Sequence, residues 1–402
     1  MRSLLLTLAL LIQDAPFDGT LARWLDNPAI QYRRRPTTDP VSALNQKIAT
    51  GAVTLEAQGP SGSLRALLQA LKIPVSSQIA VFVPDSVQAK QITPKNPRTL
   101  FFNDSVVVGW VGGGFIEIAS QDPQQGVIFY TLQEGLPGRP QIRRDDGCLG
   151  CHHTHAAVGI PGMLVRSSGQ YSVDHRVSLE QRWGGWYVTG QHGSLQHLGN
   201  VDIDKLYTAR PTRETQNWKS LEGKFPPNAY ISVHSDIVAL MVFEHQMQMM
   251  NLLTRINWEA RVSDKDKDAA VPLPEGARQV VDYLLFVDEA GIKDKITGST
   301  SFAAEFAEQG PKDKKGRSLR QFDLSRRLMR YPCSYMIYSK QFDGLPNVAK
   351  DAVYRRMWGI LSGQIRDKKY SSLSLADRSA IVEILRDTKP DLPVYFKAES
   401  VR

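Results

Sequence analysis

The pentapeptide Cys148-Leu149-Gly150-Cys151-His152 constrains this chain more than any other feature of its sequence. Cys-x-x-Cys-His is the attachment signature of a c-type haem. The spacing fits the chemistry, because each cysteine sulfur bonds one former vinyl group of the porphyrin and the following His152 offers its imidazole to the iron. With three cysteines and eight histidines in 402 residues, a random chain would contain this pentapeptide far less than once. The motif therefore predicts one haem c, bonded through Cys148 and Cys151, with His152 as proximal ligand.

Two other interpretations of the pentapeptide stay open. A structural zinc site needs four ligands, usually with a second pair of cysteines or histidines. Only Cys333 remains elsewhere, although His153 and His155 lie close to the motif. A redox-active dithiol needs a preceding strand in a βαβ unit, whereas the polar residues 141–147 favour a loop. If the haem uses the two motif cysteines, we expect Cys333 to be a buried, inert thiol.

The first thirteen residues are similar to a short secretory signal. Met1-Arg2-Ser3 precedes an apolar run from Leu4 to Ile12, which gives a positive start before a short hydrophobic core. The run is shorter than the about 20 residues that span a bilayer. The alternative is a buried N-terminal helix or strand. Because thioether attachment of haem needs an oxidising, exported compartment, both features together predict a bacterial periplasmic protein. A membrane tether would require that the segment is not cleaved.

The composition is that of a folded protein with a basic surface. The chain is 42% hydrophobic and 22% charged, which is ordinary for globular proteins. Its net charge of +8 favours an acidic surface on a redox partner protein. Nucleic acid is not expected as a partner, because no binding motif occurs and export argues against it.

Residue patterns divide the chain into four segments. The signal-like segment covers residues 1–13, an α+β region covers 14–140, the haem-binding segment covers 141–204, and a helical region covers 205–402. The predicted fold class is α+β. It has a small N-terminal antiparallel sheet with helices, a loop-rich haem segment and a helical C-terminal half.

Periodicity predicts the elements within these segments. Apolar residues at helical spacing predict helices at Val41–Ala49 and Ser63–Leu71. Apolar runs between turn residues predict strands at Ile79–Val83, Val106–Val111, Phe115–Ala119 and Val127–Leu132. For the C-terminal half we expect a long helix within residues 229–262 and further helices at Arg278–Ala290, Leu319–Met329, Lys350–Leu361 and Leu375–Arg386.

All eight histidines lie between His152 and His245, and this clustering bears on the sixth position of a haem iron. The protein fills that position with a side chain or leaves it open. The candidate distal ligands are His245 first, then His192 and His175, with Met163 as the rival. His245 leads because a long helix presents a ligand rigidly. For each histidine, a hydrogen-bonded structural role is the alternative.

A tryptophan-rich stretch suggests the walls of the cofactor site. Trp183, Trp186 and Tyr187 offer large apolar surfaces with polar groups, which suits a porphyrin, although ordinary core packing would use them equally well. We expect the loop residues 153–200 and the helix near 234–252 to surround the haem.

Several segments together resemble bacterial exported proteins described as cytochrome c domain-containing. The resemblance extends over most of the chain, and the pieces that carry it are Asn96-Pro97-Arg98 with Phe102-Asn103-Asp104, Cys148 to His152 with Val158-Gly159-Ile160-Pro161-Gly162, Arg182 to Gly190 with His192 and Gly199-Asn200, Ser235 to Gln246, and Arg330 to Tyr338. It implies one covalent haem and an electron-transfer role. The chain differs from the small all-helical cytochromes, where the pentapeptide lies near the start and a methionine ligand well downstream.

Three functions are compatible with these patterns. The first is an exported monohaem cytochrome that passes electrons to a partner. The second is a haem enzyme, peroxidase-like or a small-molecule dehydrogenase, with an open or displaceable sixth iron position. The third is a haem-based sensor or assembly partner without turnover. The size of the chain favours the enzyme, and the absence of a second Cys-x-x-Cys-His disfavours it.

Overall fold

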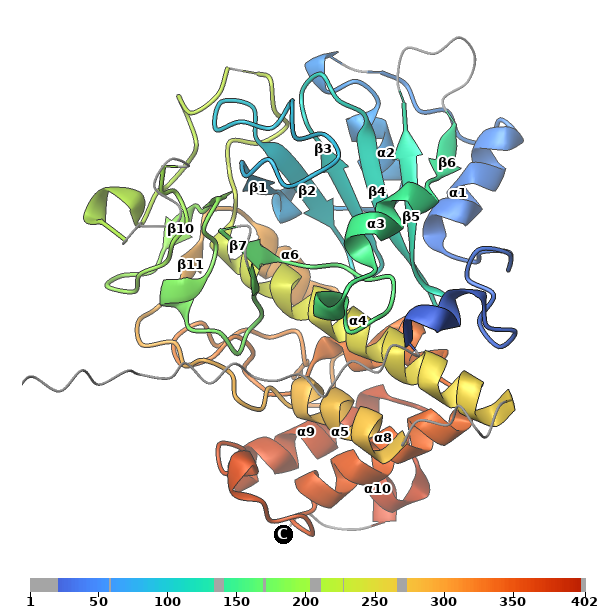
Figure 1. The fold of residues 1–402 in the computed structure, drawn as a ribbon. Coiled ribbons are helices and arrows are strands. Elements are labelled where there is room, and N and C mark those ends of the chain that lie inside the picture. The colour runs from blue at the N-terminus through green and yellow to red at the C-terminus, as the bar shows by residue number, and fades with distance from the viewer. Residues whose placement is uncertain are drawn as a thin grey trace, which may run out of the picture.

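The computed structural model describes residues 21–57, 59–133, 141–168, 171–202, 211–226, 228–265 and 273–398. The signal-like segment 1–13 lies outside these residues. The described residues form an antiparallel sheet of seven strands together with ten α-helices, and the C-terminal half is helical. The predicted α+β class is therefore confirmed. Figure 1 shows the sheet in the upper half of the molecule and most of the C-terminal helices in the lower half.

The sheet has the strand order β6-β5-β4-β3-β2-β1-β9, and all its neighbouring strands are antiparallel. The strands are β1 Ile79–Val81, β2 Arg98–Phe102, β3 Val106–Trp110, β4 Ile116–Asp122, β5 Gly126–Leu132, β6 Ile142–Arg144 and β9 Trp186–Tyr187. The four predicted strands are confirmed as β1, β3, β4 and β5, with ends shifted by up to three residues. Strands β2, β6 and β9 were not predicted.

Strand β6 corrects one expectation for the residues before the motif. The expected loop over 141–147 is wrong for residues 142–144, which pair with β5. This pairing is antiparallel and at the edge of the sheet, so it does not form the βαβ unit that a redox-active dithiol needs.

The helices pack on both sides of this sheet and below it. They are α1 Pro40–Ala49, α2 Leu64–Ala70, α3 Leu149–His152, α4 Ile237–Lys265, α5 Leu273–Leu284, α6 Phe302–Glu308, α7 Lys340–Asp343, α8 Asn347–Leu361, α9 Leu375–Thr388 and α10 Val394–Ala398. Short two-stranded sheets join β7 Arg166–Ser167 to β8 Tyr171–Ser172, and β10 Gly190–Gln191 to β11 Thr297–Gly298.

The predicted helix at Leu319–Met329 is wrong. The Asp323 carboxylate accepts hydrogen bonds from the amides of Ser325 and Arg326, and Leu324 adopts a φ of 57°. This local turn competes with helix formation, although the apolar residues have helical spacing.

Helix α4 connects the two halves of the molecule. It runs diagonally beneath the sheet in Figure 1, and nearly all of its residues are buried. Phe243 packs against Phe102 of β2 with ring centroids 5.1 Å apart, while the other side of α4 contacts α5. One hydrophobic cluster extends from Trp24 to Phe396. The regions 14–140, 141–204 and 205–402 therefore share a core.

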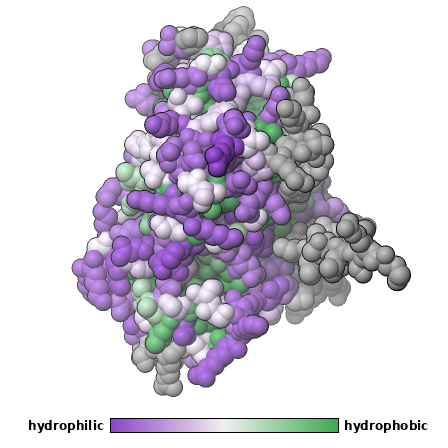
Figure 2. All heavy atoms as spheres, turned by 90° about the vertical axis from the view of Figure 1, so that its left-hand side faces the viewer, coloured by the Kyte–Doolittle hydropathy of each residue, from purple (hydrophilic) through white to green (hydrophobic). Residues whose placement is uncertain are grey.

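Among the described residues, no helix is both long and apolar enough to cross a membrane. The face of the molecule in Figure 2 is mostly hydrophilic, and its hydrophobic residues form small separate areas.

Candidate haem site

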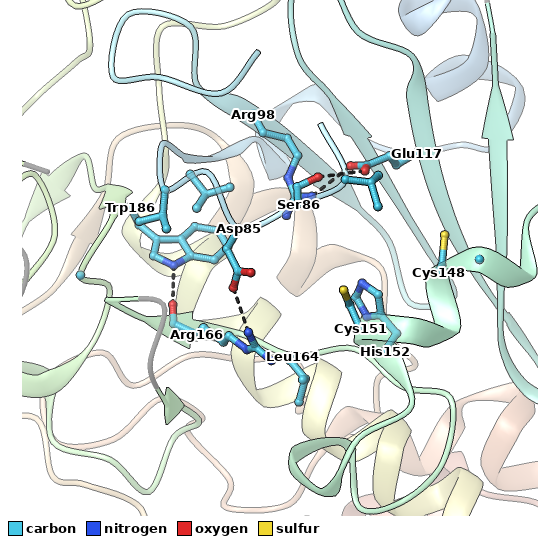
Figure 3. Close-up of a pocket in the computed structure, with 15 residues that line it drawn as sticks. Asp85, Ser86, Arg98, Glu117, Cys148, Cys151, His152, Leu164, Arg166 and Trp186 are labelled. Atoms are coloured by element: carbon cyan, nitrogen blue, oxygen red, sulfur yellow. Dashed lines mark hydrogen bonds and ion pairs between the residues drawn. The ribbon is translucent and has the colours of Figure 1, made fainter. Parts of the chain in front are cut away.

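Residues Leu149–His152 of the pentapeptide form the one-turn helix α3 in front of the sheet (Figure 1), and Cys148 ends the turn just before it. Asp145 begins the turn, because its carboxylate accepts a hydrogen bond from the Gly147 amide at 2.9 Å. Cys148 is half-buried and Cys151 is exposed, and both are free thiols. Burial raises the pKa of Cys148 to about 12. Figure 3 shows both sulfurs and the His152 ring at one cavity.

His152 has the protonation pattern of a metal-binding imidazole. Its Nδ1 lies 2.9 Å from the carbonyl oxygen of Gly162. Because a carbonyl only accepts, Nδ1 carries the proton and Nε2 keeps a free lone pair. Burial lowers the pKa of His152, so the neutral ring is favoured. Metal-binding histidines usually donate their second ring nitrogen in this way, which fixes the ring and raises its basicity.

A side chain of helix α4 anchors the loop that positions His152. The Asn251 side chain accepts from the Met163 amide at 3.0 Å and donates to the Met163 carbonyl at 2.8 Å. The Gly162 amide donates to the carbonyl of His152 at 2.9 Å. A Cβ on Gly162 would lie 2.4 Å from Asn251 Oδ1, so this close approach requires glycine. The ring of Phe129 packs on His152 with centroids 4.8 Å apart.

Neighbouring strands supply the walls of the cavity. Val81 pairs with Arg98 on one side and with Trp186 on the other, so three strands place these residues on one face. The empty space between the lining residues is about 890 Å³, and this volume includes the part that is open to solvent. The described residues that line it are Val81, Val83, Asp85, Ser86, Val87, Arg98, Glu117, Gly147, Cys148, Cys151, His152, Leu164, Arg166, Gly184 and Trp186.

Two ion pairs line this cavity. Arg98 and Glu117 form the inner pair, with 3.0 Å between Nη1 and Oε2 and side chains 21% and 22% exposed. Arg166 and Asp85 form the rim pair at 2.9 Å, with side chains 35% and 49% exposed. The charges of Arg98, Glu117 and Arg166 all act on the pKa of His152, the arginines lowering it and the glutamate raising it. Both pairs line the same cavity as the imidazole.

Two of the candidate distal ligands lie in the core, His245 on α4 itself and His175 beside it. Their Nδ1 atoms are 2.9 Å apart, and His245 Nε2 lies 2.8 Å from the Ser334 hydroxyl. Both histidines are buried, and burial lowers the pKa of each. Their neighbour Glu244 pairs with Arg182 and accepts from the Trp183 indole. Neither histidine is among the residues that line the cavity.

The other two candidates also lie away from the lining. His192 donates from Nδ1 to the Leu195 carbonyl at 2.9 Å and accepts at Nε2 from the Asn217 amide at 3.0 Å. Met163 is half-buried against the core. Within the part of the chain that the structure describes, His152 is thus the only histidine or methionine that lines the cavity.

The expected aromatic wall is present in part. Trp186 lines the cavity, and its indole donates to the Arg166 carbonyl at 2.8 Å. Trp183 is buried with a φ of 68° and bonds to Glu244 instead. The Tyr187 hydroxyl donates to the Pro94 carbonyl. The loop 153–200 therefore supplies Leu164, Arg166, Gly184 and Trp186, whereas α4 acts indirectly through Asn251.

The donor set fits a c-type haem. Two free thiols and an imidazole with an unprotonated Nε2 converge on one cavity, and its remaining walls combine apolar side chains with two arginine–carboxylate ion pairs. Within the described residues, no group of three or more histidine, cysteine, aspartate or glutamate side chains is arranged to hold a metal ion. Cys333 is fully buried, and burial raises the pKa of its thiol.

No family model, curated protein or solved structure matches this chain. The resemblance to exported cytochrome c domain-containing proteins therefore stays a prediction.

Proposed function

We propose that this chain is an exported monohaem c-type cytochrome that transfers electrons through one haem. Cys148 and Cys151 would bind the haem covalently, and His152 Nε2 would bind its iron. The observation that carries the proposal is the hydrogen bond from His152 Nδ1 to Gly162, at a cavity that both cysteines line.

The residues around the cavity suit a redox centre. A bound haem c supplies a one-electron iron couple. The Gly162 carbonyl makes the His152 imidazole more electron-rich, which favours the oxidised state. Val83, Leu164 and Trp186 give the cavity apolar walls. Cys151 is exposed and Val87 is 69% exposed, so one edge of the site is accessible to a redox partner.

Absorption spectra of the protein from periplasmic extracts test this proposal. We expect haem bands that shift on reduction with dithionite and that stay with the polypeptide under denaturing conditions. Recovery of a colourless, folded protein from cells that assemble c-type cytochromes would contradict it.

One observation favours the second candidate function, a haem enzyme. Among the described lining residues, no histidine or methionine other than His152 is available as a sixth ligand, and two ion pairs face the cavity instead. An open sixth position lets a substrate reach the iron. A high-spin spectrum of the oxidised protein supports this candidate, whereas a low-spin six-coordinate spectrum supports a pure electron carrier.

A further inference from the structure

We infer that the inner pair Arg98–Glu117 is a binding site for small weak acids H–X, hydroperoxides among them, that approach the iron side of the cavity. The inference rests on the proposed haem site and names the ligand class that the open sixth position would take. In this site, Glu117 accepts the proton of the ligand and Arg98 pairs with its anion.

The fold gives no stability reason for this ion pair. Glu117 lies between the buried residues Ile116 and Ile118 in β4, and Arg98 reaches it from β2 across β3. Taking two charges largely out of water costs free energy that their attraction only partly returns. Apolar side chains would therefore fill this part of the cavity at no loss of stability, which indicates that the charges serve the cavity.

The sheet makes room for the pair. Gly109 of β3 lies opposite Glu117 in the strand register. A Cβ on Gly109 would be 3.3 Å from Glu117 Oε2 and 3.1 Å from Leu100 Cδ2. A larger residue would push the carboxylate away. Glycine in the interior of a strand is otherwise unfavourable and often marks a close approach of this kind.

The pair also has hydrogen-bonding capacity left for a ligand. Arg98 Nε is buried and has no hydrogen-bond partner among the described residues, which is uncommon for a buried donor. Glu117 accepts one bond from Arg98 at 3.0 Å and one at 3.2 Å from the Ser86 hydroxyl. Each carboxylate oxygen can accept more than one bond. Figure 3 shows Arg98, Ser86 and Glu117 together at one wall of the cavity, apart from His152.

Charge balance selects weak acids over other ligands. The pair is neutral before binding. When H–X enters, its H–X bond breaks, the proton moves to the Glu117 carboxylate and the electron pair stays on X⁻. Arg98 is then released from Glu117 and pairs with X⁻, so the cavity is neutral again. Nothing is oxidised or reduced in this step. A neutral base such as imidazole gains nothing from the pair.

The rim pair Arg166–Asp85 is the second ion pair of the cavity, with which the inner pair Arg98–Glu117 can be compared. It lines the same cavity but is more exposed than the inner pair. Carboxylate groups of a haem would meet Arg166 at the opening, since arginine binds carboxylates well. If Arg98 and Glu117 instead held the haem itself, changing them would alter haem retention rather than ligand affinity.

The test is a spectroscopic titration of the oxidised, haem-loaded protein with cyanide, a weak acid, and with imidazole. Glu117→Gln keeps the shape and removes the proton acceptor. We expect the cyanide affinity to fall about tenfold, the effect of losing one charge-assisted bond. Imidazole affinity should stay within about twofold. The control Asp351→Asn, in an exposed ion pair with Arg355 that does not line the cavity, should leave both affinities unchanged.

The Ser86→Ala variant should change the cyanide affinity in the opposite direction. Removing this hydroxyl takes away one hydrogen bond that the Glu117 carboxylate accepts, so the freed oxygen is available to the proton of the ligand. We expect cyanide affinity to rise about twofold to threefold with imidazole affinity unchanged. Ser86 lies in a loop, so the substitution leaves the strands of the sheet unchanged.

Three results would overturn the inference and leave the proposed haem site intact. The first is equal cyanide affinity in the wild type and Glu117→Gln together with no rise in Ser86→Ala. The second is a haem-loaded wild type that binds no cyanide, and the third is loss of haem from Glu117→Gln together with unchanged cyanide affinity in Ser86→Ala. A wild-type protein without haem, seen in its spectrum before any titration, overturns the proposed function itself and this inference with it.

Discussion

Gly162 is the residue whose backbone contributes most to the geometry at His152. Its carbonyl accepts the imidazole proton, its amide donates to the His152 carbonyl, and its missing side chain lets Asn251 approach. In the sequence it lies ten residues after His152, and nothing in the sequence assigned it a role at the site.

Gly162→Ala should lower the free energy of unfolding by about 1–3 kcal/mol, because the new Cβ meets Asn251 Oδ1 and breaks its bonds to Met163. Urea denaturation measures the change. Gly150→Ala is the matched control inside the pentapeptide, since a Cβ there meets nothing within 4 Å. A helix prefers alanine, so the control should be neutral or more stable. Equal stabilities of the two variants would contradict this account of the Gly162 contact.

The pentapeptide could be predicted from the sequence, whereas most of the residues around it could not. Arg98 and Glu117 come from strands in which alternating polar residues ordinarily point to solvent, and only the antiparallel register brings them to the motif. His245 was favoured for its place on a long helix. The part of that helix around His245 is buried on all sides. The His245 ring therefore contacts His175 and Ser334 in the core instead of the cavity.

Among the secondary-structure elements, α4 depends on a buried cap. Asp236 precedes the helix, and its Oδ1 accepts from the amides of Val238 at 2.8 Å and Ala239 at 3.2 Å. Its Oδ2 accepts from the amide and hydroxyl of Thr300, both at 2.8 Å. One side chain therefore begins the central helix and ties it to the segment that precedes α6.

We expect Asp236→Ala to destabilise the protein by about 2–3 kcal/mol, because the capping bonds and two further hydrogen bonds are lost together. Asp236→Asn, which keeps an oxygen acceptor, should cost clearly less. Thermal unfolding followed by circular dichroism compares the two variants. Equal losses would show that charge, rather than capping geometry, is what matters at this position.

Elements with an apolar pattern of their own were predicted, and several elements without one were missed, for a physical reason. Helices α1, α8 and α9 and strands β3 and β5 have apolar periodicity along their own length, so local sequence determines them. Strands β6 and β9 have three and two residues and exist because a neighbouring strand pairs with them. The turn at Asp323 overrides a helical pattern through side-chain bonds to the backbone.

At the scale of the whole molecule, buried carboxyl groups should make stability depend on pH. Burial raises the pKa of Glu289 from 4.5 to about 7, while the bond from the Leu328 amide lowers it. The folded protein thus keeps a proton that the unfolded chain releases near pH 4.5. Stability from this group is present below pH 4.5 and is lost as the pH rises to about 7.

Glu289→Gln removes this dependence because glutamine does not titrate. Relative to the wild type, the variant should gain about 1 kcal/mol or more between these two pH values. The lowered pKa values of the buried His175 and His245 change stability with pH in the opposite direction. Both proteins contain these histidines, so their contribution cancels when the two stabilities are subtracted. Urea denaturation of both proteins across the window measures it, and a difference that does not vary with pH would contradict the prediction.

Intact-mass spectrometry of the protein exported from cells that assemble c-type cytochromes tests the central claim most directly. The account predicts a mass increased by one covalently bound haem, and no such increase in the double variant Cys148→Ala, Cys151→Ala. A wild-type protein of unmodified mass with both thiols free, or a double variant that keeps its haem through acid–acetone extraction, would contradict it.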